Sequence, residues 1–243
     1  MEDLVSVIIS SYNRYDSLKV AIHSLKNQTY KNLEIIVIDD GSDDKRYKNK
    51  IDGVEIINLE NKNSRKVLGF PSCGYVRNFG FRKAKGKYIT ILDDDDYFLP
   101  QKINTQVNIL KNKKYLACCS DAFLSQTVIK MNNITKDLLL YNKHYWWKEL
   151  TKILNIKHNI PKLIDSKLIN KHNLIICSTI MFDRKIFELI GYMKEVQNSK
   201  GSNGIFQDYN YWKDIINHSK IYYIRDPLII YYKKYSNFNK NLY

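Results

Sequence analysis

Long apolar runs are missing from this sequence. No stretch approaches the roughly 20 apolar residues that a helix needs to cross a bilayer. The first residues, Met1-Glu2-Asp3, are acidic where a secretion signal carries positive charge, so we expect no signal peptide. These two absences favour a cytoplasmic protein, in which any contact with a membrane would be peripheral.

Cysteine and histidine are also scarce. The four cysteines form no C-x-x-C pair, and the five histidines lack the spacing of a metal site. Cys118 and Cys119 are adjacent within an apolar stretch, which is typical of thiols in a protein core. The sequence therefore excludes a disulfide framework and favours a reducing compartment.

Acidic residues are outnumbered by basic ones. The 243 residues include 39 Lys and Arg but 25 Asp and Glu, which gives a net charge of +14. Such a charge attracts nucleotide phosphates, an anionic membrane surface or an acidic polymer. The Lys residues are scattered among many Asn, Ile and Tyr, a bias that an AT-rich genome also produces. The charge alone therefore does not select a partner.

What the sequence does contain is a regular alternation in its first half. Four short apolar runs predict buried strands, and two amphipathic stretches predict helices. The strands are expected at 5–10, 33–38, 54–58 and 88–92, and the helices at 17–28 and about 74–85. This order predicts an α/β fold with a Rossmann-like, mostly parallel central sheet flanked by helices.

Polar clusters follow three of these strands. They are Ser11-Tyr12-Asn13, Asp39-Asp40-Gly41 and the acidic run from Asp93 to Asp96. In a parallel sheet the ligand crevice lies beyond the carboxyl ends of the strands, so the three clusters are expected in one crevice.

The acidic run is the strongest chemical signal. A solvated turn is the ordinary explanation for acidic residues, but carboxylates packed this tightly repel one another unless a cation compensates. Asp93 and Asp95 are two residues apart and can both turn toward one ion. Ligation by oxygen alone suits Mg²⁺ or Mn²⁺.

The second half is less regular. We expect a helix after Pro100, strands at 115–123 and 178–182, a helix ending at Gly191 and another from Asp208 to Asn217. Residues 221–232 are interpreted as a pair of strands broken at Asp226-Pro227. A polar, basic insertion at about 131–171 contains Tyr145-Trp146-Trp147. We find no linker that would divide the chain, so we expect one domain.

Five segments in order resemble the family-2 inverting glycosyltransferases, which have the GT-A fold. They are Val5–Arg14, Ser24–Tyr30, Glu34–Ser42, Arg77–Ile89 and Leu92–Pro100. The resemblance continues more weakly through Ser178–Gly191 and Gln207–Lys213. It implies one GT-A domain over 1–243, with a nucleotide-binding half at 1–100 and an acceptor-binding half at 101–243.

The resemblance implies a function as well. A sugar would move from a nucleotide-sugar donor, for which UDP is the expected nucleotide, to a hydroxyl of a glycan, lipid-linked or protein-linked acceptor. The reaction would require Mn²⁺ or Mg²⁺ and would invert the anomeric configuration. No nucleic-acid partner is expected, and the sequence does not assign an oligomeric state.

The resemblance also assigns roles to single residues. Ser11, Tyr12, Asn13 and Asp40 would hold the nucleotide, and Arg77 would reach a phosphate. Asp93 would lie near the ribose or the metal, Asp95 would bind the metal directly, and Asp94 is grouped with the nucleotide-binding residues. Asp208 would be the catalytic base, with Asp214 as the fallback. Gln207 stands where relatives usually have Glu, and Tyr235 stands where they often have a His, which leaves the third metal ligand unassigned.

Three alternatives remain open from the residues alone. A sugar-nucleotide nucleotidyltransferase would share the fold type, but it usually has a glycine-rich basic signature, and Ser10–Arg14 contains no glycine. A nucleic-acid-binding protein would fit the charge of +14 and the 19 Tyr, but no nucleic-acid motif is present. The Tyr145-Trp146-Trp147 cluster either stacks on an acceptor sugar or packs the insertion against the sheet.

Overall fold

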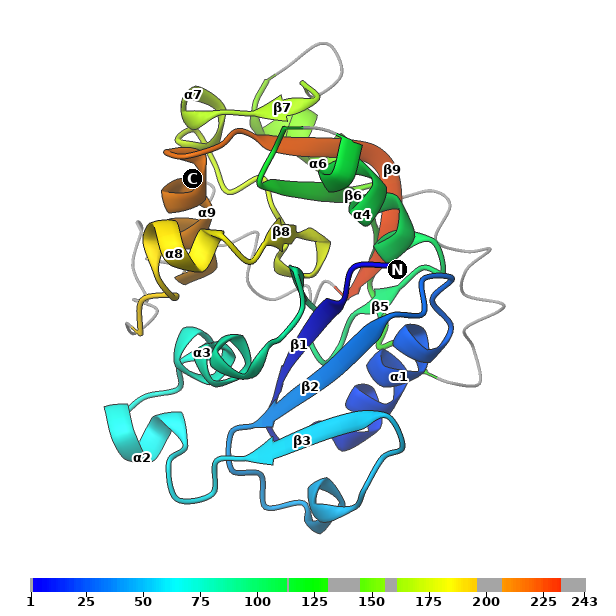
Figure 1. Cartoon of the computed structure of the whole chain (residues 1–243), viewed down its shortest axis with the longest axis vertical. Helices are drawn as coiled ribbons and strands as arrows, with labels where there is room; N and C mark the ends of the chain where they lie inside the picture. Colours follow the sequence, from blue (N-terminus) through cyan, green and yellow to red (C-terminus); the bar gives the residue numbers. More distant parts are fainter. Residues whose placement is uncertain (1, 113, 131–144, 156–160, 196–206, 233–243) are drawn as a thin grey trace.

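A curled sheet forms the centre of the molecule (Figure 1). The computed structural model describes residues 2–112, 114–130, 145–155, 161–195 and 207–232. Its strands are β1 (Val5–Ser11), β2 (Leu33–Asp39), β3 (Val54–Asn58), β4 (Tyr88–Ile91), β5 (Tyr97–Phe98), β6 (Ala117–Ser125), β7 (Leu163–Ile164), β8 (Met181–Asp183) and β9 (Ile221–Tyr232). They lie in the order β3-β2-β1-β4-β8-β6-β9-β5, and β7 pairs with β9.

The first four strands are parallel, as the alternation of apolar runs predicts. β1 lies between β2 and β4, and β3 extends the sheet beside β2. Every residue of β4 is buried, which explains why its sequence is a continuous apolar run with one Thr. β8 then joins antiparallel to β4, and β6 and β9 are parallel to each other. The prediction of a mostly parallel α/β sheet is confirmed.

Helices cover the sheet. They are α1 (Tyr15–Lys26), α2 (Ser64–Leu68), α3 (Cys73–Lys83), α4 (Lys102–Asn112), α6 (Trp146–Ile153), α7 (Ser166–Ile169), α8 (Ile186–Ile190) and α9 (Gln207–Ile216), with short 3₁₀ turns η1 (Lys45–Lys48) and η4 (Cys177–Thr179). α3 packs on β1 and β2, and α9 packs beside α3 (Figure 1). A Cβ atom at Gly80 of α3 would collide with Ile8, so glycine allows α3 to lie close to β1.

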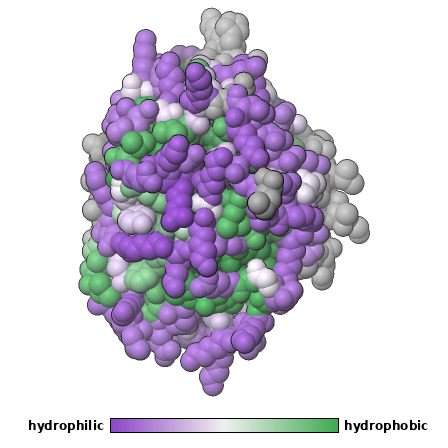
Figure 2. All heavy atoms as spheres, viewed as in Figure 1, coloured by the Kyte–Doolittle hydropathy of each residue, from purple (hydrophilic) through white to green (hydrophobic). Residues whose placement is uncertain are grey.

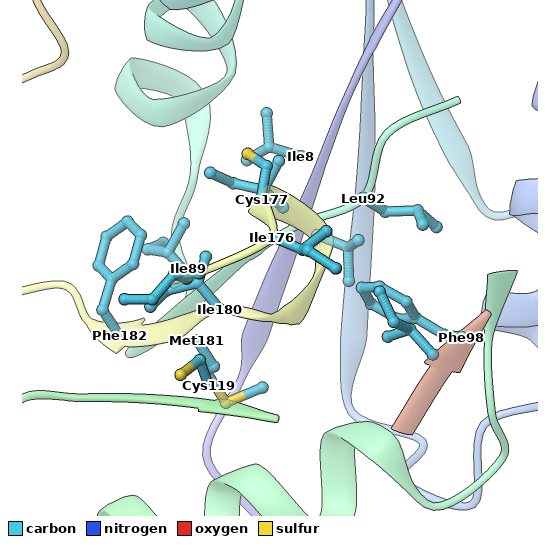
Figure 3. Packing of buried hydrophobic residues seen from close by; sticks show 14 of the residues in the cluster. Ile8, Ile89, Leu92, Phe98, Cys119, Ile176, Cys177, Ile180, Met181 and Phe182 are labelled. Atoms are coloured by element: carbon cyan, nitrogen blue, oxygen red, sulfur yellow. The ribbon is translucent and has the colours of Figure 1, made fainter. Parts of the chain in front are cut away.

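The main core joins the two halves of the chain. Figure 3 shows Ile8 of β1 and Ile89 of β4 gathered with Cys177, Met181 and Phe182 from the segment through η4 and β8. All five are buried in one apolar cluster. Because this cluster contains residues from both halves of the sequence, it fixes the second half of the sheet against the first.

Two expectations for the second half are corrected. Residues 178–182 do not form one strand, because η4 occupies their start and only Met181–Asp183 pairs in the sheet. Residues 221–232 form one strand rather than a broken pair. β9 accommodates Pro227 at a bulge, where Ser120–Ala122 of β6 oppose Ile224–Ile229. Proline lacks an N–H donor, and a bulge is where a sheet tolerates that loss.

The region interpreted as an insertion also contributes to the sheet. Residues 131–144 and 156–160 lie outside the described residues, but the rest of 131–171 contains α6, β7 and α7. β7 pairs antiparallel with the start of β9. Within the part of the chain that the structure describes, no helix is long and apolar enough to span a membrane. The face in Figure 2 is mostly hydrophilic, with apolar residues showing between the polar ones.

Candidate active site

The acidic loop after β4 is held by a chain of hydrogen bonds. The Asp93 amide donates to Ser178 Oγ (3.0 Å), and that hydroxyl donates to Asp96 Oδ2 (2.5 Å). Asp96 Oδ1 accepts from the amide of Tyr232 at the end of β9 (2.9 Å). Asp96 is fully buried, and burial raises its pKa well above the usual range. Asp96 therefore orients the loop and connects it to β9, while Asp93 and Asp95 remain about one quarter exposed.

Arg77 lies beneath this loop. It projects from α3, is buried, and donates from Nη2 to Asp93 Oδ1 (2.6 Å). Its Nε has no hydrogen-bond partner among the described residues. The sequence interpretation assigns Arg77 to a phosphate, whereas in the structure it donates a hydrogen bond to the Asp93 carboxylate. Arg77 fixes Asp93 and leaves one donor unused.

Arg14 was missed as a site residue by sequence reasoning. Its Nη1 donates to Asp94 Oδ1 (3.1 Å) and to Asp95 Oδ2 (2.8 Å). Asp94, in turn, is buried and accepts from Ser11 Oγ (2.7 Å). The sequence does place Arg14 directly after the polar cluster Ser11-Tyr12-Asn13, which was expected in the same crevice as the acidic run. That position could have identified it. Together, Arg14 and Arg77 pair with all three of the carboxylates from 93 to 95.

These carboxylates are close enough to affect one another's protonation. Burial, followed by the neighbouring charges of Asp93 and Asp94, raises the pKa of Asp95 to about 6 against the opposing effect of Arg14. Burial also raises the pKa of Asp94. A further cation bound beside these carboxylates would favour their charged forms and so oppose the effect of burial on the pKa.

The loop between β1 and α1 is tied to the loop after β2. The Asn13 amide donates to Ser42 Oγ (2.8 Å), and Asn13 Oδ1 accepts from the Asp43 amide (2.9 Å). Asn13 has a positive φ of 51°, a left-handed conformation that asparagine tolerates better than most residues. The buried Asp39 accepts from the Ser42 amide (2.9 Å) and so shapes the same loop.

Asp40 and Tyr12 share a partner. Asp40 Oδ1 accepts from the Ser64 amide (2.7 Å), and Oδ2 accepts from the Ser64 hydroxyl (2.6 Å) and from Arg65 Nη1 (3.4 Å). The Arg65 guanidinium lies over the Tyr12 ring, 4.0 Å from its centroid. Ser64 and Arg65 at the start of α2 had no predicted role. They join two predicted nucleotide-binding residues into one surface.

Asp208 reaches the crevice because α9 is fixed to α3. Gln207 Oε1 accepts from the Gly74 amide, and Gln207 Nε2 donates to Ser72 Oγ (3.0 Å). These contacts bind the first turn of α9 to the first turn of α3. A glutamine can make both, because its amide offers an acceptor and a donor.

The charges of Arg77 and Asp93 both act on the Asp208 carboxyl. Burial raises the pKa of the Asp208 carboxyl, Arg77 opposes that increase, and Asp93 adds to it. Asp208 Oδ1 accepts a local hydrogen bond from the amide of Tyr209 (2.7 Å). Its raised pKa favours uptake of a proton.

Tyr231 is a further crevice residue that sequence reasoning did not assign. Burial raises the pKa of its hydroxyl, and the charges of Asp96, Asp93, Asp95 and Asp208 raise it further. The charges of the acidic loop and of Asp208 on α9 therefore all act on the Tyr231 side chain of β9. Its position directly after the apolar run Leu228-Ile229-Ile230 was a weak signal. Tyr235 lies outside the described residues.

The aromatic cluster divides into two parts. Trp146 is buried, and its Nε1 donates to the Leu174 carbonyl (2.9 Å), so it belongs to the core. Tyr145 and Trp147 are only half-buried, with ring centroids 6.2 Å apart, and they line a hollow of about 330 Å³. Trp146 lies in the core and Trp147 is partly buried against it, so core packing accounts for much of the cluster.

The donor set at the loop fits a hard divalent ion. Among the described residues, no three His, Cys, Asp or Glu side chains converge on one point. Mg²⁺, however, is usually held by one or two carboxylates together with substrate phosphates and water. Asp93 and Asp95 supply two partly exposed carboxylates of that kind. They could hold Mg²⁺ or Mn²⁺ together with a phosphate-bearing ligand.

Comparison with known sequences is decisive for the family. The sequence model described as "Glycosyl transferase family 2" matches residues 6–191. The chain belongs to this family. An Escherichia coli relative described as a UDP-Glc:alpha-D-GlcNAc-diphosphoundecaprenol beta-1,3-glucosyltransferase is 32% identical over 184 residues, which cover 75% of this chain and 61% of that protein. A glycosyltransferase of Rickettsia typhi is 30% identical over 93% of this chain and 63% of its own length.

Solved structures show the same fold for this family-2 member. The crystal structure of Staphylococcus aureus TarS 1–349 covers 95% of this chain, with a TM-score of 0.63 and 17% identity. The same TarS fragment has been solved with UDP-GlcNAc, again with a TM-score of 0.63. The chain spans about three fifths of the length of the curated relatives it matches. Asp208 and Tyr231 lie beyond the matched range of 6–191, so their grouping with Asp93 rests on the structure.

Proposed function

We propose that this family-2 glycosyltransferase moves a sugar from a UDP-sugar to a hydroxyl of a lipid-linked sugar diphosphate, with inversion at the anomeric carbon. The observation that carries the proposal is that Asp208 is a carboxyl whose pKa burial raises, and that the charges of Arg77 on α3 and Asp93 of the acidic loop both act on it. Displacement at an anomeric carbon requires a base for the acceptor hydroxyl and, in the same crevice, groups that bind the departing diphosphate. The E. coli relative acts, by its description, with UDP-Glc on a GlcNAc-diphospholipid.

The donor would lie along the ends of β1, β2 and β4. Tyr12, Asp40 and Arg65 form the surface for the nucleotide, and the diphosphate would approach Asp93 and Asp95. Mg²⁺ or Mn²⁺ held there would neutralise charge that develops on the departing diphosphate. Arg77 keeps Asp93 in position through Nη2 and has Nε free for a further contact.

Asp208 would accept the proton of the acceptor hydroxyl as that oxygen attacks the anomeric carbon. A base is most effective when its pKa is raised toward the working pH, and burial raises the pKa of Asp208. The acceptor oxygen attacks from the side opposite the leaving group. Its bond to the anomeric carbon forms as the bond from that carbon to the diphosphate oxygen breaks. An α-linked donor would therefore yield a β-linked product.

The catalytic assignment is tested by Asp208→Asn, which keeps the shape of the side chain and removes the base. We expect transfer to fall about 10²- to 10⁴-fold, the usual contribution of general base catalysis, while the Kd for UDP measured by calorimetry changes little. Asp214→Asn is the matched control, since Asp214 lies on the same helix and is 38% exposed near Lys194. Full turnover by Asp208→Asn would reject the assignment.

Metal dependence is tested separately. Exhaustive chelation should stop transfer, and Mn²⁺ or Mg²⁺ should restore it. Asp95→Asn should weaken the binding of Mn²⁺ in the presence of UDP, measured by electron paramagnetic resonance, because one oxygen ligand loses its charge. Full activity in the chelated protein, or unchanged Mn²⁺ binding by Asp95→Asn, would contradict a metal at this loop.

A further inference from the structure

Cys73 is an exposed thiol at the start of α3. All four cysteines lie in the described residues, and the other three, Cys118, Cys119 and Cys177, are buried. The transfer proposed above makes no use of Cys73. Its surroundings decide whether this thiol belongs to an open surface or to the crevice.

Arg77 connects Cys73 with the acidic loop. The two residues are four apart on α3, so their side chains share one face of the helix, and the Arg77 side chain points back toward the first turn. Arg77 is 7% exposed and donates from Nη2 to Asp93 Oδ1 (2.6 Å). Its buried Nε has no hydrogen-bond partner among the described residues. A ligand with an oxygen beside Cys73 would supply the acceptor that this donor lacks.

Gln207 connects Cys73 with the start of α9. It bonds to the residues on either side of the cysteine, since its Oε1 accepts from the Gly74 amide and its Nε2 donates to Ser72 Oγ (3.0 Å). Asp208 is the next residue after Gln207. A Cβ atom at Gly74 would lie 2.8 Å from Gln207 Oε1, so position 74 has no room for a side chain. Cys73 therefore supplies the exposed side chain where α3 meets the start of α9.

The surroundings of the Cys73 thiol are those of a concave surface. Withdrawal from water raises its pKa, the charge of Arg77 opposes that increase, and the charges of Asp93 and Asp208 add to it. The side chain is nevertheless open to solvent. A group that is accessible and yet surrounded by protein lies in a hollow of the surface. Cys73 therefore lines the crevice on which both the acidic loop and α9 act.

We propose that Cys73 lines the part of the crevice that holds the sugar of the UDP-sugar donor and sets the space available to it. This inference rests on the proposed function, in which the anomeric carbon lies between the diphosphate at the acidic loop and the base Asp208. The sugar would lie against the thiol, and one of its hydroxyl oxygens would accept from Arg77 Nε. A thiol is small and bonds weakly to hydroxyls, so position 73 would select by size.

The nucleotide and the sugar would contact different residues, so the two contributions to binding can be measured apart. The surface proposed for the nucleotide consists of Tyr12, Asp40 and Arg65. Isothermal calorimetry with Mn²⁺ compares UDP with UDP-glucose and UDP-GlcNAc. Cys73→Leu should raise the Kd of both UDP-sugars about 10- to 100-fold, because the larger side chain occupies the space of the sugar, and should leave the Kd of UDP unchanged. Cys73→Ser, of similar size, should retain all three values.

Alkylation of the thiol gives a second measurement, on the wild-type protein. N-ethylmaleimide adds to the thiolate of Cys73 by forming a carbon–sulfur bond, and mass spectrometry follows the rate. A UDP-sugar at about ten times its Kd should slow this reaction about 10-fold, because it covers the thiol, and UDP at about ten times its own Kd should slow it less than about twofold. The control is Lys83→Cys in a Cys73→Ala protein, at the exposed end of α3, where no ligand should slow alkylation.

Three results would overturn the inference. They are equal protection of Cys73 by UDP and by the UDP-sugars, no protection by a bound UDP-sugar, and equal Kd values of the UDP-sugars for wild type and Cys73→Leu. Selective protection by a UDP-sugar without any sugar transfer would support the sugar site and refute the proposed function. A wild-type protein that binds neither UDP-sugar would refute both.

Discussion

Asp121 offers a sharp test of the reasoning about buried charge. It lies on β6, is fully buried, and accepts from the Trp147 amide through Oδ1 (3.0 Å). Burial raises the pKa of its carboxyl from 3.8 to about 7, although the amides of Ala122 and Trp147 oppose that increase. The change we consider is Asp121→Asn, which keeps an oxygen for Trp147 and removes the ionisable group.

The size of the effect follows from the difference in pKa. In the unfolded chain Asp121 loses its proton near pH 4, and in the folded protein near pH 7, so the folded state holds more protons between these values. Stability from this group is therefore complete at low pH and is lost as the pH rises through 7. A difference of about 3 pH units corresponds to about 4 kcal/mol, of which roughly 2.5 kcal/mol is lost between pH 5 and pH 8.

The assay is urea denaturation of wild type and Asp121→Asn at a series of pH values from 5 to 8. The stability of the variant relative to wild type should increase by roughly 2.5 kcal/mol across that range, because asparagine carries no charge to desolvate. Contributions from other groups cancel in the difference. Asp226→Asn, at an exposed position on β9, is the control for the same change of side chain. A flat difference for Asp121→Asn would refute a buried carboxyl with this pKa.

Two other substitutions test the packing around the crevice. Gln207→Ala removes the partners of the Gly74 amide and Ser72 Oγ, so the free energy of unfolding should fall by about 1–3 kcal/mol, and an unchanged urea midpoint would argue against the α3–α9 contact. Lys102 is fully buried, donates to Thr90 Oγ1 (2.5 Å), and has a pKa that burial holds well below its usual value. Because the folded protein disfavours the ammonium, Lys102→Met should gain stability over wild type most at low pH, and urea midpoints with no pH dependence in their difference would contradict this.

The first half of the fold could be predicted because β1, β2 and β4 are largely buried on both faces. Val7–Ile9 and Ile35–Ile38 are continuous apolar runs at the centres of β1 and β2, and the polar residues that follow mark where these strands end. The same rule placed the three polar clusters at one edge of the sheet. Local sequence was sufficient here because each element is defined by its own burial pattern.

The second half depends on contacts between residues far apart in sequence. The continuity of β9 through Pro227 follows from a bulge against β6, and no local pattern contains that information. Arg14 was overlooked for a similar reason, since its partners Asp94 and Asp95 are 80 and 81 residues away. Tyr231 is brought to the crevice by the hydrogen bond from the Tyr232 amide to Asp96, which joins the end of β9 to the acidic loop.

The acidic loop is the point at which both halves of the sequence meet. Arg14 and Arg77 hold it from the first half, and Ser178 and Tyr232 hold it from the second. These contacts fix its carboxylates, so a donor would meet them already oriented. A cation held by such preorganised carboxylates would stabilise developing negative charge without reorganisation during the reaction. Substitutions that loosen either set of contacts should therefore reduce turnover even when they lie outside the crevice.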